Sequence, residues 1–205
     1  PFYPETLGAV LVAFTAQRIT NGESLSGRTA ALAGAAIGWL VWLHVRFVVL
    51  AFALFLWMLW TCRRSSRALT MLTVACGALT GAFCLYAYHV TGSLLPTAFY
   101  DAATPDAGFR MSRLPVALLG ILFDRENGLL ALAPVYLLAL PGIGLMVRTQ
   151  RRTAAAVVSL IGALMVTVAG HGYESSGTSP LRYMVAVLPL AALPIAVLLR
   201  AMRGR

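Results

Sequence analysis

Residues 68–88 read ALTMLTVACGALTGAFCLYAY, an unbroken run without a single Asp, Glu, Lys or Arg. A helix needs about 20 apolar residues to cross the hydrocarbon core of a bilayer, at about 1.5 Å per residue, and this run is long enough. Across all 205 residues, 60% are hydrophobic, 11% are charged and the mean hydropathy is +0.81. A soluble domain has about 45–50% apolar and about 25% charged residues. The composition excludes an ordinary globular, disordered or fibrous protein and predicts a membrane protein with several spans.

Outward from this run, apolar segments alternate with short polar connections along the whole chain. We expect an all-α membrane bundle with about seven transmembrane helices. The predicted spans are residues 5–16, 29–43, 47–61, 68–88, 128–147, 153–170 and 183–199. A further apolar piece, 114–123, is too short to cross and is predicted to be an interfacial or re-entrant helix. Pro134, Pro141, Pro189 and Pro194 are expected to kink the fifth and seventh spans.

The basic residues are distributed unevenly between the connections. All 16 are arginines, against seven acids, and the formal net charge is +9. They fall in short clusters between apolar runs and not in a stripe interleaved with aromatics, so no nucleic-acid partner is expected. Most of them lie in alternate connections, which the positive-inside rule assigns to the cytoplasm. This set comprises Arg18, Arg28, Arg63, Arg64, Arg67, Arg148, Arg151, Arg152, Arg200, Arg203 and Arg205.

The other connections hold most of the remaining titratable side chains, and we expect any chemistry at that non-cytoplasmic face. Longer outer loops would by themselves also collect polar residues, and this simpler explanation stays open. The residues concerned are Glu5, His44, His89, Asp101, Asp106, Asp124, Glu126, His171 and Glu174.

The connection between the second and third spans consists of only His44, Val45 and Arg46. Such a short link holds both polar side chains at the membrane boundary, where they could grip an anionic phosphate. Alternatively, Arg46 snorkels to a lipid headgroup. Glu5 stands in the first turn of the first span, where the helix dipole favours an acid by about 0.3–1 kcal/mol. It has either that role alone or a functional one.

The stretch 171–183, HGYESSGTSPLRY, is the most suggestive for binding. Its glycines and hydroxyls allow a sugar or phosphate to approach the chain closely. Arg182 stands at a predicted helix start, where a cation is disfavoured by about 0.3–1 kcal/mol. We therefore expect Arg182 to serve a partner anion, either in the protein or in a ligand.

Several short motifs, taken in order, resemble bacterial multi-span glycosyltransferases of the GT-C superfamily. They are the aromatic-Pro-Glu start at 2–5, the WLHVRF junction at 42–47, the GSxxPT loop at 92–97, the NGLL sequence at 127–130 before Pro134, and the Arg182-Tyr183 pair. Relatives in this superfamily include protein mannosyltransferases, lipid A aminoarabinose transferases and mycobacterial-type arabinosyltransferases. The resemblance implies transfer of a sugar from a polyprenyl-phosphate donor to an acceptor at the non-cytoplasmic face of a bacterial plasma membrane, in the cell envelope.

The key acid of these enzymes lies in a first outer loop that nothing in this chain matches. We therefore expect residues 1–205 to be one transmembrane domain, the C-terminal part of a protein whose upstream helices and catalytic base are missing. The candidates for binding the donor phosphate are His44, Arg46 and Arg182. The candidates for sugar or acceptor binding are Glu5, Tyr100, Asp101, His171, Glu174 and Tyr183. Of these, Glu5 would orient an arginine or the donor sugar. The expected partners are the polyprenyl-phosphate-linked sugar and membrane lipid. No cofactor or metal is expected, because the acids do not converge by spacing.

Two alternatives belong to other classes of protein. A transporter would need polar residues inside its spans to mark a pathway, and the predicted span interiors carry almost no ionisable group. A non-enzymatic membrane scaffold would bind a partner protein through its outer loops, and its outer polar residues would tolerate single substitutions.

Overall fold

The structure, a computed structural model, describes residues 3–21, 25–95, 109–126, 128–170 and 180–203. Within these ranges every regular element is a helix and no strand occurs, in agreement with the predicted all-α class. The elements are α1 (Pro4–Asn21), α2 (Gly27–Leu43), α3 (Phe47–Cys62), α4 (Ser66–Thr91), η2 (Met111–Arg113), α6 (Leu114–Phe123), α7 (Leu129–Leu132), η3 (Pro134–Leu138), α8 (Ala139–Thr149), α9 (Arg151–Gly170), α10 (Pro180–Met184) and α11 (Leu188–Arg203).

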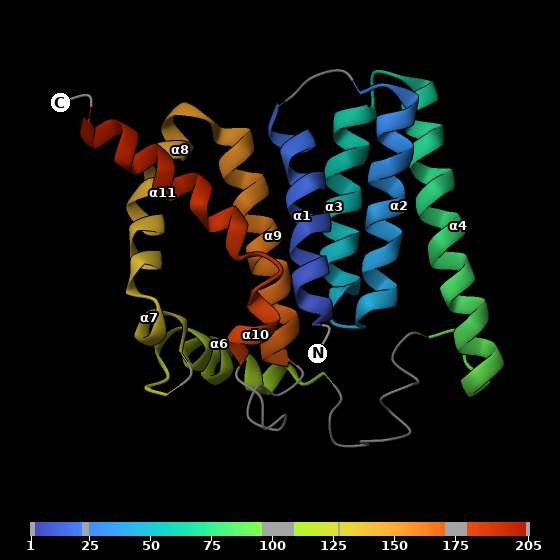
Figure 1. Ribbon diagram of the computed structural model, residues 1–205. Coiled ribbons are helices and arrows are strands. Elements are labelled where there is room, and N and C mark those ends of the chain that lie inside the picture. Colours follow the sequence, from blue (N-terminus) through green and yellow to red (C-terminus); the bar gives the residue numbers. More distant parts are fainter. Residues whose placement is uncertain (1–2, 22–24, 96–108, 127, 171–179, 204–205) are drawn as a thin grey trace.

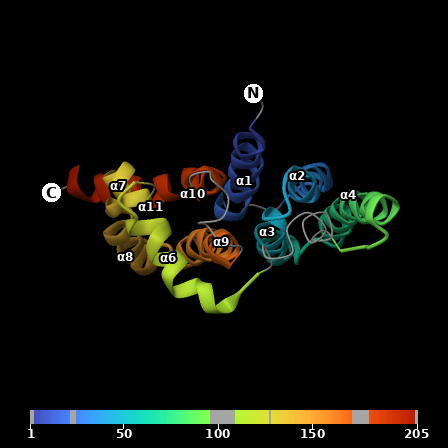
Figure 2. The same cartoon turned by 90° about the horizontal axis from the view of Figure 1, so that it is seen from below.

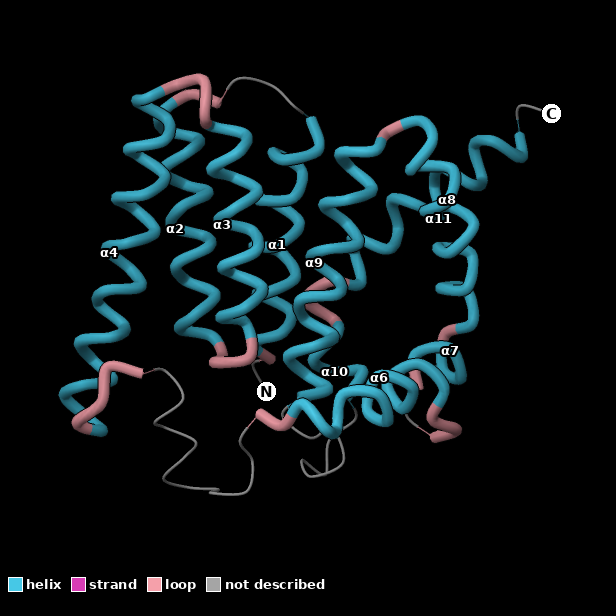
Figure 3. The backbone as a smooth tube through the Cα atoms, turned by 180° about the vertical axis from the view of Figure 1, so that it is seen from behind, coloured by secondary structure: helices cyan, strands magenta, loops and turns pink. Residues whose placement is uncertain are grey.

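Five helices stand side by side, in the order α4, α2, α3, α1 and α9 (Figures 1 and 3). The α1–α2, α3–α4 and α8–α9 connections all lie at the same end of the helix axes, the upper end in Figure 1. We call this the arginine-rich end, because these connections and the adjoining helix turns carry eight arginines of the larger set named above. At the opposite end, α6 lies crosswise to α9 (Figures 1 and 2). The helix at 114–123 is therefore confirmed, and its crosswise direction suits an interfacial segment.

Two helices, α4 and α9, are long and apolar enough to cross a membrane by length and composition. Further apolar helical stretches, including α2 and α3, have 10–17 residues. The structure therefore does not confirm seven full-length spans. The first four predicted segments nevertheless coincide with α1 to α4, each within a few residues except that α1 runs five residues further.

The fifth predicted span, 128–147, is wrong as a single helix. The chain forms α7, η3 and α8 instead, and the break falls at Ala133, whose φ of −142° and ψ of 72° are not helical. Ala133 precedes Pro134, and proline both lacks an N–H donor and disfavours helical backbone in the residue before it.

The seventh predicted span, 183–199, is also interrupted. The helix α10 ends at Met184, and α11 begins only at Leu188. Pro189 cannot donate to the carbonyl of residue 185, so the chain turns through residues 185–187 and starts a new helix. Pro194, in contrast, lies buried inside α11. This interruption lets the short α10 lie apart from α11, which decides the position of Arg182.

The helix pair α2–α4 packs through glycines. A Cβ atom at Gly34 would come within 2.3 Å of the Leu72 carbonyl oxygen, and one at Gly38 within 2.8 Å of the Leu79 Cβ. The spacing is that of the GxxxG motif, which brings apolar helices into close contact. The Trp42 indole adds a hydrogen bond from Nε1 to the Leu79 carbonyl oxygen at 3.0 Å.

Gly34→Ala is expected to destabilise the protein by about 1–3 kcal/mol, because the new methyl group meets backbone and the helices must separate. Gly77→Ala in α4 is the matched control. A Cβ there meets nothing within 4 Å, so the better helix propensity of alanine is expected to leave stability unchanged or slightly higher. Thermal unfolding of both variants in detergent checks this. Equal stability of the two variants would contradict the close α2–α4 contact.

Candidate functional site

Three separate segments meet at the end opposite the arginine-rich end: the start of α1, the α2–α3 turn and α10. Figure 2 shows this end, with α10 beside α1. The side chains that they bring together form what we call the polar cluster: Tyr3, Glu5, His44, Arg46, Arg182 and Tyr183.

Glu5 and Arg182 form a partly buried ion pair at the centre of this cluster. The distance between Arg182 Nε and Glu5 Oε1 is 2.9 Å, and Glu5 is only 3% exposed. The two atoms are close but not aligned as a hydrogen bond. Nε and the second oxygen, Glu5 Oε2, are both buried and have no hydrogen-bond partner within the described chain. The sequence leaves open whether the anion that Arg182 binds belongs to the protein or to a ligand. In the structure, the Glu5 carboxylate of the protein is such an anion.

Arg182 also contacts an aromatic ring that precedes α1. Its Cζ atom lies 5.0 Å from the centroid of the Tyr3 ring, within the range of a cation–π contact. The Arg182 side chain is 39% exposed even though its Nε is buried. A guanidinium has five N–H donors in a plane, so the ion pair and the ring do not exhaust its donor capacity.

The α2–α3 turn is held by its own backbone and by His44. Phe47 N–H donates to the His44 carbonyl at 2.9 Å, and Arg46 N–H donates to His44 Nδ1 at 3.1 Å. Because Nδ1 accepts this bond, the neutral His44 ring carries its proton on Nε2. The turn thereby fixes both the tautomer of His44 and the position of Arg46.

Tyr183 joins this turn to α10. Its ring centroid lies 4.0 Å from Arg46 Cζ and 5.7 Å from the His44 ring centroid. Neighbouring residues of a helix point in different directions, so α10 presents Arg182 to α1 and Tyr183 to the α2–α3 turn. Stacking occupies the face of the Arg46 guanidinium and leaves its edge N–H groups able to donate. Two arginines against one glutamate give the cluster one positive charge in excess.

An apolar groove begins next to the polar cluster. It has a volume of about 550 Å³ and is lined by residues of α1, η3, the 185–187 turn and α11, among them Ala9, Tyr136, Val185, Leu188 and Pro189. Ala9 lies one helical turn after Glu5 on the same face of α1, and Val185 follows Arg182 by three residues. The charged pair therefore stands at one end of an apolar surface.

Five of the predicted site residues thus come together in the structure: Glu5, His44, Arg46, Arg182 and Tyr183. The other four, Tyr100, Asp101, His171 and Glu174, lie outside the described residues. Two features of the site were not predicted from the sequence: Tyr3 and the apolar groove. Tyr3 could have been found from its place in the aromatic-Pro-Glu start, whereas the groove residues are ordinary apolar side chains that no pattern distinguishes.

Comparison of the chain with protein-family models, with curated proteins and with solved structures finds no match in any of the three. A function therefore has to follow from the geometry of the polar cluster and of the groove beside it.

Proposed function

We propose that the chain is part of an integral membrane glycosyltransferase of the bacterial plasma membrane. It would move a sugar from a polyprenyl-phosphate donor to an acceptor at the non-cytoplasmic face. The observation that carries this proposal is the juxtaposition of the polar cluster and the apolar groove. A lipid-linked phosphate is itself an anion attached to a long apolar chain, and the site offers cations at one end of an apolar surface.

The location in a membrane is supported by the two long apolar helices and by the charge of the two ends. The arginine-rich end would face the cytoplasm, as the positive-inside rule requires. At the opposite end, the Trp42 ring lies against the rings of Trp39, Phe83 and Tyr86, at centroid distances of 5.3–6.2 Å. Aromatic groups of this kind are typical of the membrane–water boundary.

In the reaction, the departing lipid phosphate carries the developing negative charge. Arg46, Arg182 and His44 Nε2–H are the donors that would stabilise it. Glu5 would position Arg182 with Oε1, and its unpartnered Oε2 would accept a hydrogen bond from a sugar or acceptor hydroxyl. The carboxylate base that removes the acceptor proton would come from outside this chain.

The buried polar residues argue against a carrier. In the described part of the chain they are Glu5, Thr15 and Thr167. Both threonine hydroxyls donate to carbonyls of their own helices, at 2.8 Å. The described helices therefore offer no row of polar groups across the bundle of the kind that a transport pathway needs.

The proposal predicts that Arg46→Ala lowers sugar transfer by about 10- to 100-fold, the value of a charge-assisted hydrogen bond to phosphate. The measurement uses membranes that contain the full-length gene product and a panel of radiolabelled polyprenyl-phosphate sugars. Arg125→Ala is the matched control, because Arg125 is an exposed arginine in the loop before α7, outside the cluster. Equal activity of the two variants would exclude Arg46 from donor binding, and no transfer from any donor would favour the scaffold.

A further inference from the structure

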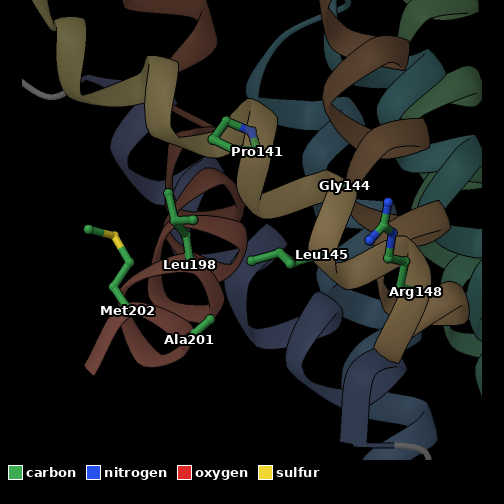
Figure 4. Close-up of a pocket in the computed structure, with 7 residues that line it drawn as sticks. All are labelled: Pro141, Gly144, Leu145, Arg148, Leu198, Ala201 and Met202. Atoms are coloured by element: carbon green, nitrogen blue, oxygen red, sulfur yellow. The ribbon is translucent and has the colours of Figure 1, made fainter. Parts of the chain in front are cut away.

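A second groove lies between α8 and α11, at the arginine-rich end and away from the polar cluster. Its volume is about 380 Å³. Figure 4 shows side chains of both helices around it, with Leu145 and Leu198 on facing helices and Arg148 further along α8. Among the described residues that line it, Arg148 is the only charged one. We call it the α8–α11 groove.

The groove begins beside a close contact between the two helices. At that point, a Cβ atom on Gly142 would lie 2.1 Å from the Pro194 carbonyl oxygen, so the backbones are in direct contact. All lining residues of α11 and most of those of α8 follow this contact in sequence. One of them is Gly144, where an added Cβ would meet nothing within 4 Å. The space is therefore open to an occupant.

Arg148 supplies an uncompensated positive charge to this space. It is exposed, and no hydrogen bond or ion pair joins it to another residue of the described chain. Arg200 and Arg203 lie in the last turn of the facing helix, α11. The described lining of the groove includes no acidic residue. An occupant that fits it is apolar along its length and anionic at one end.

We propose that the α8–α11 groove is a binding site for an anionic phospholipid. One acyl chain lies against Leu145, Leu198 and Met202, and the phosphate accepts hydrogen bonds from Arg148. Basic pockets between helices at the cytoplasmic side of a membrane recognise such headgroups. The inference rests on the membrane location proposed above, but not on sugar transfer, because the groove and the polar cluster share no residue.

The test measures how many phosphatidylglycerol molecules the full-length gene product retains. The protein is reconstituted in nanodiscs of phosphatidylcholine with phosphatidylglycerol, extracted into detergent, and weighed by native mass spectrometry. Arg148→Gln is expected to lower the affinity about fivefold, the value of one arginine at a charged lipid surface. Gly144→Leu fills the open space without meeting backbone and is expected to reduce retention to a similar extent.

Two controls separate a built site from general attraction. Arg151→Gln removes the same charge at the same end of the protein but outside the groove, and it should retain phosphatidylglycerol like wild type. Gly162→Leu places the same side chain at another glycine with nothing within 4 Å. An equal loss with Arg151→Gln, or no loss with Gly144→Leu, would overturn the proposal. A protein that stays outside the nanodisc would overturn the membrane location as well, whereas absent sugar transfer would leave this site standing.

Discussion

Arg182→Ala is expected to lower sugar transfer by about 100- to 1,000-fold, the cost of removing one donor that stabilises a developing anion. Arg182 precedes the groove residue Val185 by three positions, and its N–H groups outside the ion pair are the ones that would meet the lipid phosphate. The loss should appear mainly in the rate at saturating donor, because the phosphate gains charge as the bond to the sugar breaks. Transfer assays over a range of donor concentrations measure it.

The control for this variant must match its charge and its end of the protein. Arg125→Ala again serves, since Arg125 is exposed and lies outside the polar cluster. Arg182→Lys is informative beside it, because lysine keeps the charge but lacks the planar fork that binds phosphate through two bonds. Full activity of Arg182→Lys would mean that charge alone suffices. Full activity of Arg182→Ala would exclude the residue from the reaction.

The second large effect is a loss of stability, which a pair of variants distinguishes from the loss of activity. Arg182→Met leaves the Glu5 carboxylate buried without its partner, and we expect it to destabilise the protein by about 2–3 kcal/mol. This is below the cost for a fully buried pair, because Arg182 is 39% exposed. The double variant Glu5→Leu/Arg182→Met removes both charges, and we expect its stability to return to within about 1 kcal/mol of wild type.

Thermal unfolding in detergent compares the single and the double variant, and the transfer assay is run on both. The expected combination is restored stability with transfer still lost, because the double variant keeps the packing but has no cation at position 182. A double variant as unstable as the single one would show that the loss came from packing and not from the unpaired carboxylate. A double variant with restored transfer would remove Arg182 from the proposed site.

The sequence predicts the ends of helices well where a capping residue next to the helix determines them. The Ser26 and Ser65 side chains accept from backbone N–H groups three residues on, at 3.2 and 3.3 Å, and so begin α2 and α4 near the predicted positions. Gly92 ends α4 with a φ of 74°. The apolar pattern did not predict that Pro134 and Pro189 would break helices and not merely kink them. The reason is that a hydrophobic run shows the length of a segment and not the continuity of its hydrogen bonds.

The candidate site was predicted in its members but not in its arrangement. The sequence explains Glu5 by the helix dipole or by a function, and Arg182 by an anion in the protein or in a ligand. Their pairing depends on how α10 packs against α1, and the two residues are distant in sequence. The break before Pro189 separates α10 from α11, and α10 makes this contact with α1. The apolar groove likewise depends on how distant segments pack, since it is bounded by segments from three parts of the chain. The sequence pattern of each segment alone does not predict it.

Binding of a polyprenyl phosphate, compared with the corresponding polyprenol, measures whether the polar cluster recognises a lipid-linked phosphate. The full-length gene product in nanodiscs is titrated with each compound, for wild type, Arg46→Ala, Arg182→Ala and Arg125→Ala. We expect wild type and Arg125→Ala to prefer the phosphate, and both cluster variants to lose this preference while still binding the polyprenol in the apolar groove. Equal affinity of wild type for the two compounds would contradict the claim that the polar cluster binds a lipid-linked phosphate.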